Sequence, residues 1–127
     1  NTGNLLNNYI SVKNALVSSD SKAANTAISA LNEAVKSEDN FAQKAELQKA
    51  TEKLSKAGNN IEKQRAAFND VSTIMWKLVK PSDKVNQPVY YQYCPMKKAY
   101  WLSKEKDIKN PYYGSSMLTC GKVAETK

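Results

Sequence analysis

Histidine is absent from the 127-residue sequence, which removes the commonest general base and the commonest metal ligand of proteins. The sequence also lacks a nucleophile elbow, a phosphate-binding loop and a paired-carboxylate signature, and its carboxylates are scattered along the chain. These groups are the usual means of acid–base and nucleophilic catalysis. We therefore predict that the chain is a binding module and not an enzyme.

Arginine is nearly absent as well, since Arg65 is the only one in the sequence. The formal net charge of +7 is spread out: residues 1–80 carry 11 basic and 8 acidic side chains, and residues 81–127 carry 8 and 4. The longest basic run is Lys97-Lys98. Nucleic-acid-binding surfaces usually cluster their basic residues and read bases with arginine. We therefore expect no nucleic-acid partner and interpret the charge as favouring solubility.

Long apolar runs are also missing, and none approaches the ~20 residues that span a bilayer. We expect no transmembrane segment, and no export signal is visible at Asn1. The length predicts a single domain over residues 1–127, which can bury a core without help from metals or disulfides. Within it we expect a helical bundle at about 4–80 and a segment rich in cysteine, methionine and aromatic residues at about 88–127.

Helical periodicity dominates the residues before Pro81, where apolar side chains recur at steps of three and four. The four expected helices contain Leu5 to Val17, Ala24 to Val35, about Asn40 to Ala57, and Asn59 or Asn60 to the residue before Pro81. Asp20 is placed to cap the second helix and Gly58 to end the third. The second and third could also form one bent helix. Short polar joints favour antiparallel neighbours, so the predicted fold class is all-α, an antiparallel three- or four-helix bundle with an irregular, aromatic-rich C-terminal segment.

The composition changes after Pro81, because six of the seven tyrosines lie beyond it together with Trp101 and three of the four prolines. Residues 89–94 and the stretch around Val123 favour strands, and residues 103–108 suit a short helix capped by a serine. We expect a mostly irregular segment that packs its aromatic rings onto the bundle.

The aromatic side chains of this segment have two interpretations. They form a surface that stacks on bases or sugars or binds a protein partner, or they simply cover the bundle. The single arginine, on the fourth helix, could anchor a carboxylate or a backbone carbonyl, or remain in solvent. The candidate binding-surface residues are Tyr93, Trp101, Tyr112, Tyr113 and Arg65.

Sulfur is concentrated at two places in the segment. Cys94 and Met96 form one pair, Met117 and Cys120 form the other, and the two cysteines are 26 positions apart. Soft sulfur ligands favour Cu(I) or Ag(I), and a structural zinc site usually has four cysteine or histidine ligands. One hypothesis is therefore a soft-metal site of these four residues.

Two other interpretations of the cysteines remain open. A Cys94–Cys120 disulfide would stabilise the fold by roughly 3–4 kcal/mol, or the two thiols are buried and unconnected. The two cysteines flank the short helix expected at 103–108, and we predict that their Cα atoms lie within about 7 Å, close enough for a disulfide bond.

Several stretches of the chain resemble a known family. They are ALVSSDSKAANTA at 15–27, EKQRAAFNDVS at 62–72, YCPM at 93–96, WLSKEKDIKNPYYG at 101–114 and MLTCG at 117–121. In this order they resemble a bacterial envelope domain of unknown function, which occurs alone or fused to periplasmic adaptor subunits of heavy-metal efflux pumps. The YCPM and Cys-Gly motifs are also similar to the small heavy-metal-binding module of copper-efflux proteins, although Lys97 stands where that module has His-Pro.

The resemblance implies a periplasmic or envelope-attached location and a heavy-metal efflux adaptor or other envelope protein as partner. Together with the sulfur pairs, it predicts an accessory domain that handles heavy metal, most simply copper. The alternative is a metal-free protein-interaction domain whose C-terminal segment is braced by the disulfide.

Overall fold

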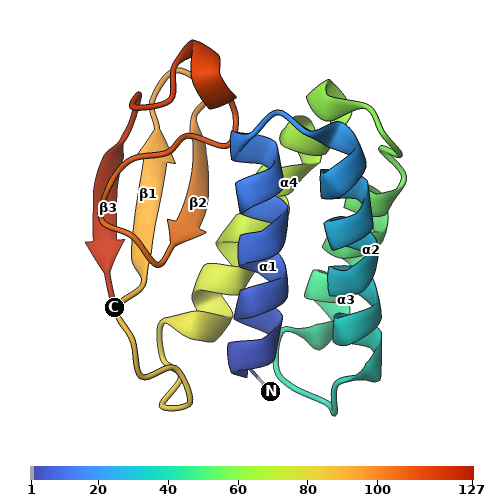
Figure 1. Ribbon diagram of the computed structural model, residues 1–127. Coiled ribbons are helices and arrows are strands. Elements are labelled where there is room, and N and C mark those ends of the chain that lie inside the picture. The colour runs from blue at the N-terminus through green and yellow to red at the C-terminus, as the bar shows by residue number, and fades with distance from the viewer. Residues whose placement is uncertain (1) are drawn as a thin grey trace.

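The computed structural model describes residues 2–127 and combines four helices with a three-stranded antiparallel sheet (Figure 1). The prediction of an all-α fold is therefore wrong, because helices make up 53% of the residues and strands 12%, and the chain is mixed α/β. The reason lies after Pro81, where the aromatic segment pairs as strands instead of lying on the bundle as an irregular cover.

The helices are α1 (Thr2–Val17), α2 (Ser21–Ser37), α3 (Lys44–Ser55) and α4 (Ile61–Val79). The expected cap of α2 is confirmed, because the Asp20 carboxylate accepts a hydrogen bond from the backbone N–H of Ala23 at 3.0 Å. Asn60 caps α4 in the same way. Gly58 lies just beyond α3 with φ of +59°, a left-handed conformation that glycine adopts without strain.

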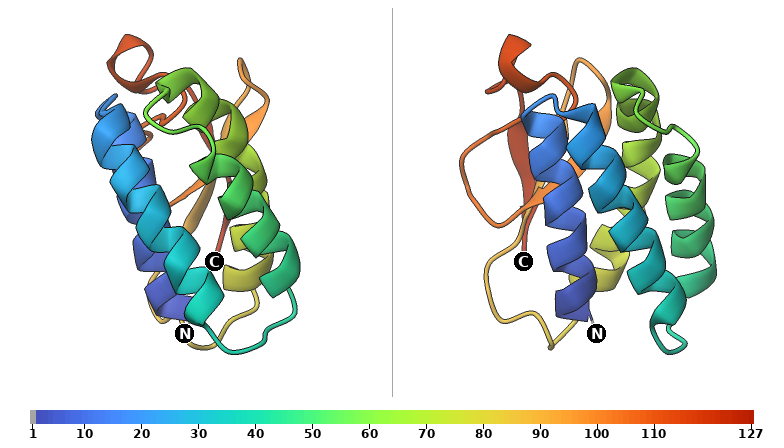
Figure 2. Two further views of the ribbon diagram at one scale, coloured as in Figure 1. Left: turned by 90° about the vertical axis from the view of Figure 1, so that its right-hand side faces the viewer. Right: turned by 45° about the vertical axis from the view of Figure 1, so that its right-hand side comes forward.

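Helices that follow one another in the chain pack side by side, and α1 also packs against α4 (Figures 1 and 2). Residues 38–43 separate α2 from α3, so the two are distinct helices and α3 begins later than the sequence indicated. Each helix buries one apolar face, as the three-and-four spacing predicts. Within residues 2–127, none of the helices has the length and apolar character needed to cross a membrane.

The sheet consists of β1 (Tyr90–Cys94), β2 (Ala99–Ser103) and β3 (Lys122–Thr126), in the order β2-β1-β3. The strand propensities of residues 89–94 and of the stretch around Val123 are thus confirmed, whereas β2 was not expected. Ser103 ends β2 instead of capping a helix, and its hydroxyl accepts a hydrogen bond from the N–H of Glu105 at 3.0 Å. A short 3₁₀ turn, Gly114–Ser116, lies between β2 and β3.

Stacked aromatic rings join one face of the sheet to α4. The rings of Trp76 and Tyr91 stack with centroids 4.7 Å apart, and Tyr91 stacks in turn on Tyr100 at 4.6 Å. The indole N–H of Trp76 donates to the carboxylate of Glu125 on β3 at 3.3 Å. These contacts bury aromatic area between helix and sheet and fix how the strands lie on the bundle.

The opposite face of the sheet is covered by the segment between β2 and β3, which crosses it in Figure 1. Trp101 projects to this face, opposite Gln92 on β1, and is completely buried. The Gln92 amide donates to the backbone carbonyls of Glu105 and Lys106 at 3.2 and 3.1 Å. The sheet thus lies between the helices and a covering loop.

Tyr9 on α1 forms a hydrogen bond with a backbone group of the edge strand β2. Its buried hydroxyl lies 2.6 Å from the hydroxyl of Ser72 on α4 and accepts a hydrogen bond from the N–H of Leu102 at 3.0 Å. Burial raises the pKa of this phenol well above its ordinary value, so it stays protonated. One side chain therefore links α1, α4 and the sheet.

We expect the substitution Tyr9→Phe to lower the free energy of unfolding by about 1–3 kcal/mol, because it leaves the buried N–H of Leu102 without an acceptor. Urea denaturation followed by circular dichroism measures the change. Tyr90→Phe is the matched control, since Tyr90 is only half-buried, and it should change stability by less than about 0.5 kcal/mol. Equal stability of the two variants would show that the Tyr9 hydroxyl does not support the sheet.

Candidate functional site

The two cysteines meet at one end of the sheet. Cys94 is the last residue of β1, and the β1–β3 pairing of Tyr93 with Lys122 places the start of β3 beside it. Cys120 lies two residues before β3, and its thiol lies close enough to Cys94 for the two groups to interact electrostatically. Both are free thiols, Cys94 buried and Cys120 partly exposed, so the disulfide is not formed in this structure. Residues 26 positions apart thus form a dithiol.

Asn110 and Gly121 hold Cys120 in this place. The buried Asn110 amide donates to the carbonyl of Cys120 at 2.7 Å and accepts from the N–H of Tyr112 at 2.8 Å. A Cβ atom added at Gly121 would lie 2.9 Å from both the Trp101 ring and the carbonyl of Tyr93. The Cys-Gly pair therefore combines a thiol with the only residue type small enough to pack between the sheet and Trp101.

The environment of the dithiol favours the protonated form of Cys120. Desolvation raises the pKa of the Cys120 thiol, and the neighbouring Cys94 raises it further by charge repulsion and hydrogen bonding. A cysteine that acts as a free nucleophile usually has a lowered pKa. The arrangement is thus better suited to binding an ion that displaces the thiol proton than to nucleophilic chemistry.

The two methionines next to the cysteines are exposed. Met96 follows Cys94 in the β1–β2 turn with 65% of its side chain accessible, and Met117 is 40% accessible. In residues 2–127 these are the only large hydrophobic side chains that are exposed, whereas Met75 is fully buried. The thioethers near the dithiol therefore do not serve as core filler.

The donors gathered here are all sulfur. Among residues 2–127, no group of three or more histidine, cysteine, aspartate or glutamate side chains could hold a metal ion. A four-coordinate zinc site is thus not provided, because such sites need four nitrogen or thiolate ligands. Two thiols with exposed thioethers nearby instead suit a soft, low-coordinate ion.

The candidate binding-surface residues take different positions. Trp101 and Tyr112 are buried, and their rings meet edge to face at 6.2 Å, so they form part of the core. Tyr93 and Tyr113 are half-buried. The aromatic set thus mostly covers the bundle and the sheet, with two rings that reach the surface.

Arg65 acts as an anchor for backbone carbonyls. Its Nε donates to the carbonyl of Pro111 at 2.8 Å, and its Nη2 donates to the carbonyl of Leu16 at 2.8 Å and to the hydroxyl of Ser19 at 3.0 Å. These bonds join α4 to the end of α1 and to the loop that covers the sheet. Of the two partners considered for Arg65, a carboxylate or a backbone carbonyl, the structure therefore shows backbone carbonyls.

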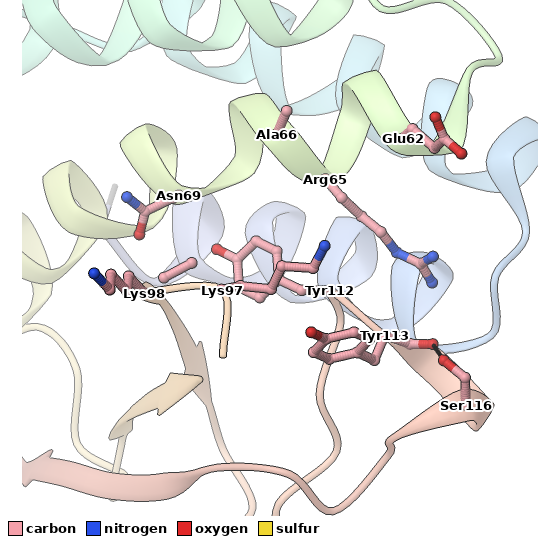
Figure 3. A pocket seen from close by; sticks show the side chains of 10 residues that line it. Glu62, Arg65, Ala66, Asn69, Lys97, Lys98, Tyr112, Tyr113 and Ser116 are labelled. Carbon is pink, nitrogen blue, oxygen red and sulfur yellow. Dashed lines mark hydrogen bonds between the residues drawn. The ribbon is translucent and has the colours of Figure 1, made fainter. Parts of the chain in front are cut away.

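A groove of about 570 Å³ lies between α4 and the C-terminal segment (Figure 3). One wall is α4, and the other consists of the β1–β2 turn and the loop around Tyr113. The residues that line it are Glu62, Arg65, Ala66, Asn69, Lys97, Lys98, Ala99, Tyr112, Tyr113 and Ser116. The sequence does not indicate this groove, although Lys97-Lys98 is its longest basic run.

Comparison with known proteins identifies a family for this chain. Residues 5–87 match the model of a family described as "Protein of unknown function (DUF3347)". No curated protein and no solved structure matches the chain. The matched residues contain α1 from residue 5 onward and all of α2, α3 and α4, and they end before β1, so both cysteines lie outside them. Since the match covers more than half of the chain, the protein belongs to the DUF3347 family of proteins of unknown function.

Proposed function

We propose that the protein binds one soft monovalent metal ion, Cu(I) or Ag(I), through the thiolates of Cys94 and Cys120. The observation that carries this proposal is the dithiol itself, two thiols from distant segments that interact with each other, each within three residues of an exposed methionine. The proposed function is binding, and the raised pKa of the Cys120 thiol supports a role as a ligand over a role as a nucleophile.

The chemistry of the donors fits such an ion. Two thiolates are sufficient ligands for a low-coordinate Cu(I) ion, and a thioether from Met96 or Met117 can add a third. The two thiolates and the ion together carry one negative charge. Lys122 lies two residues after Cys120, and Lys97 lies three residues after Cys94, so the positive charge near the site favours the loaded form.

The proposal extends to location and partner. The resemblance of several stretches, from 15–27 to 117–121, to a bacterial envelope domain supports a role in the cell envelope, periplasmic or envelope-attached, beside a heavy-metal efflux adaptor. The family match adds no function to this, since the family itself is described as one of unknown function.

A competition titration against a Cu(I) chelator under anaerobic, reducing conditions tests the proposal. We expect the wild-type chain to take up one ion, and the variants Cys94→Ser and Cys120→Ser to lose this uptake. Met96→Leu and Met117→Leu should weaken binding without changing stability, because both side chains are exposed. Met75→Leu is the control, since it changes a buried thioether of similar volume and should leave affinity unchanged.

One result would reject metal binding. If the wild type and the double Cys→Ser variant compete equally poorly, the thiols are not ligands. The metal-free interaction domain is then the better account. It is favoured by the same contact between the thiols, because oxidation of Cys94 and Cys120 would brace the loop that covers the sheet.

A further inference from the structure

The groove between α4 and the C-terminal segment is strongly cationic. Arg65, Lys97 and Lys98 line it, and Glu62 is the one carboxylate among its lining residues. Figure 3 shows Lys97 reaching into the space between α4 and Tyr113, and its ammonium group lies 5.1 Å from the centre of the Tyr113 ring. The groove therefore offers an anionic ligand a net positive charge and a flat aromatic side.

Arg65 has no carboxylate partner. No Asp or Glu in residues 2–127 lies within ion-pair distance of its guanidinium, which is partly buried. Desolvation lowers the pKa of this group, so burial destabilises its charge without a compensating counter-ion. Its three hydrogen bonds use Nε and Nη2 and go to neutral oxygens, which leaves the two N–H groups of Nη1 without an acceptor among the described residues.

The other polar groups that line the groove are mostly donors. The Asn69 side-chain oxygen is occupied by the N–H of Tyr100 at 2.8 Å, so its amide NH₂ remains to donate. The Ser116 hydroxyl already donates its proton to the backbone carbonyl of Tyr113 and offers a ligand only its lone pairs, whereas the two lysines can only donate. A ligand rich in carboxylates satisfies these donors, and a cationic or purely apolar ligand does not.

The walls of the groove are fixed in advance. Arg65 is held by α1 and by the covering loop, and Gly114 fits against it with φ of +58°, where an added Cβ would lie 2.5 Å from the Ser19 hydroxyl and 3.0 Å from the Arg65 guanidinium. A ligand would therefore meet a preformed site and would not have to order a loop, which reduces the entropic cost of binding.

We propose that this groove binds an acidic peptide segment of a protein partner, with carboxylates paired to Arg65, Lys97 and Lys98. The groove is half open, so a small anion would remain in contact with water, whereas an extended chain covers more of the groove and continues beyond it. The proposal stands on the groove alone and does not need the metal site. The β1–β2 turn that carries Lys97 and Lys98 begins at Cys94, so a bound partner would lie next to the dithiol.

Fluorescence anisotropy with a labelled twelve-residue peptide of alternating glutamate and serine tests the proposal on the reduced, metal-free protein. We expect saturable binding that weakens as salt is added. The double variant Lys97→Glu/Lys98→Glu should bind about tenfold or more weakly. The matched control is Lys49→Glu/Lys53→Glu on α3, which changes the net charge equally at exposed lysines outside the groove, and it should bind within about twofold of the wild type.

Two kinds of result would overturn the proposal. Equal losses in the two double variants would show that the peptide responds only to net charge. Tighter binding of a twelve-nucleotide single-stranded DNA or of a lysine–serine peptide would show that the ligand class is wrong. We expect the double Cys→Ser variant to bind the peptide with wild-type affinity. This measurement tests peptide binding independently of metal binding.

Discussion

Replacing Asn110 with alanine is expected to lower the free energy of unfolding by about 2–5 kcal/mol, because it leaves one buried and one partly buried backbone group unpaired. The two groups are the carbonyl of Cys120 and the N–H of Tyr112, both within 2.8 Å of the Asn110 amide. Denaturation in urea measures the loss. The same variant should release Cys120 from Cys94, so the reduced protein should take up Cu(I) more weakly.

Asn86→Ala is the matched control for this substitution. Asn86 is exposed in the connection between α4 and β1, so its loss should change stability by less than about 0.5 kcal/mol. If Asn110→Ala were as stable as this control, the hydrogen bonds of Asn110 would not hold the covering loop. If it were destabilised but bound Cu(I) with unchanged affinity, the loop would not position the thiols.

Affinity for Cu(I) or Ag(I) is expected to fall by at least about a hundredfold when the pH is lowered from about 8 to 6. The metal binds a thiolate, and desolvation together with Cys94 raises the pKa of the Cys120 thiol, which therefore keeps its proton through this range. Each proton displaced costs about tenfold in affinity per unit of pH. The affinity for the metal ion thus increases as the pH rises towards the pKa of the Cys120 thiol and decreases as the pH falls.

Chelator competition at several pH values, with the chelator's own protonation taken into account, measures this slope. Thioethers do not titrate, so Met96→Leu and Met117→Leu should shift the affinity without changing the slope. A flat affinity between pH 8 and 6 would contradict the assignment of Cys120 as a ligand that is protonated in the free protein.

The helical half of the fold could be predicted from the sequence because its signals are local. Asp20 and Asn60 accept hydrogen bonds from their own first turns, and Gly58 adopts a left-handed conformation beyond α3. The late start of α3 at Lys44 was not predicted, because nothing in the preceding polar stretch marks the boundary.

The sheet could be predicted only in part. The residues of β1 carry a strong strand propensity, but Ser103 gave a misleading signal, since a serine before a polar stretch also suits a helix cap. What makes β2 a strand is its pairing with β1 and the Tyr9 hydroxyl that satisfies its free edge. Both are contacts between segments far apart in the sequence, which local propensity does not contain.

The candidate site, like the fold, could be predicted from the sequence only in part. The clustering of sulfur at Cys94 and Cys120 predicts that the two cysteines act together, and in the structure the two side chains are near enough to interact. The cationic groove was missed because three separate segments supply Arg65, Lys97 and Tyr113. A single arginine and a pair of lysines have no functional signature until the fold places them around one space.

The placement of the two tryptophans allows the packing of the sheet to be followed by intrinsic fluorescence. Trp76 stacks on Tyr91 at the junction of α4 and the sheet, and Trp101 is buried under the covering loop. Helices α1, α2 and α3 contain no tryptophan. Indole emission therefore follows the docking of the sheet, whereas the far-ultraviolet dichroism follows the helices. Unfolding curves that coincide for the two signals would mean that bundle and sheet melt as one cooperative unit.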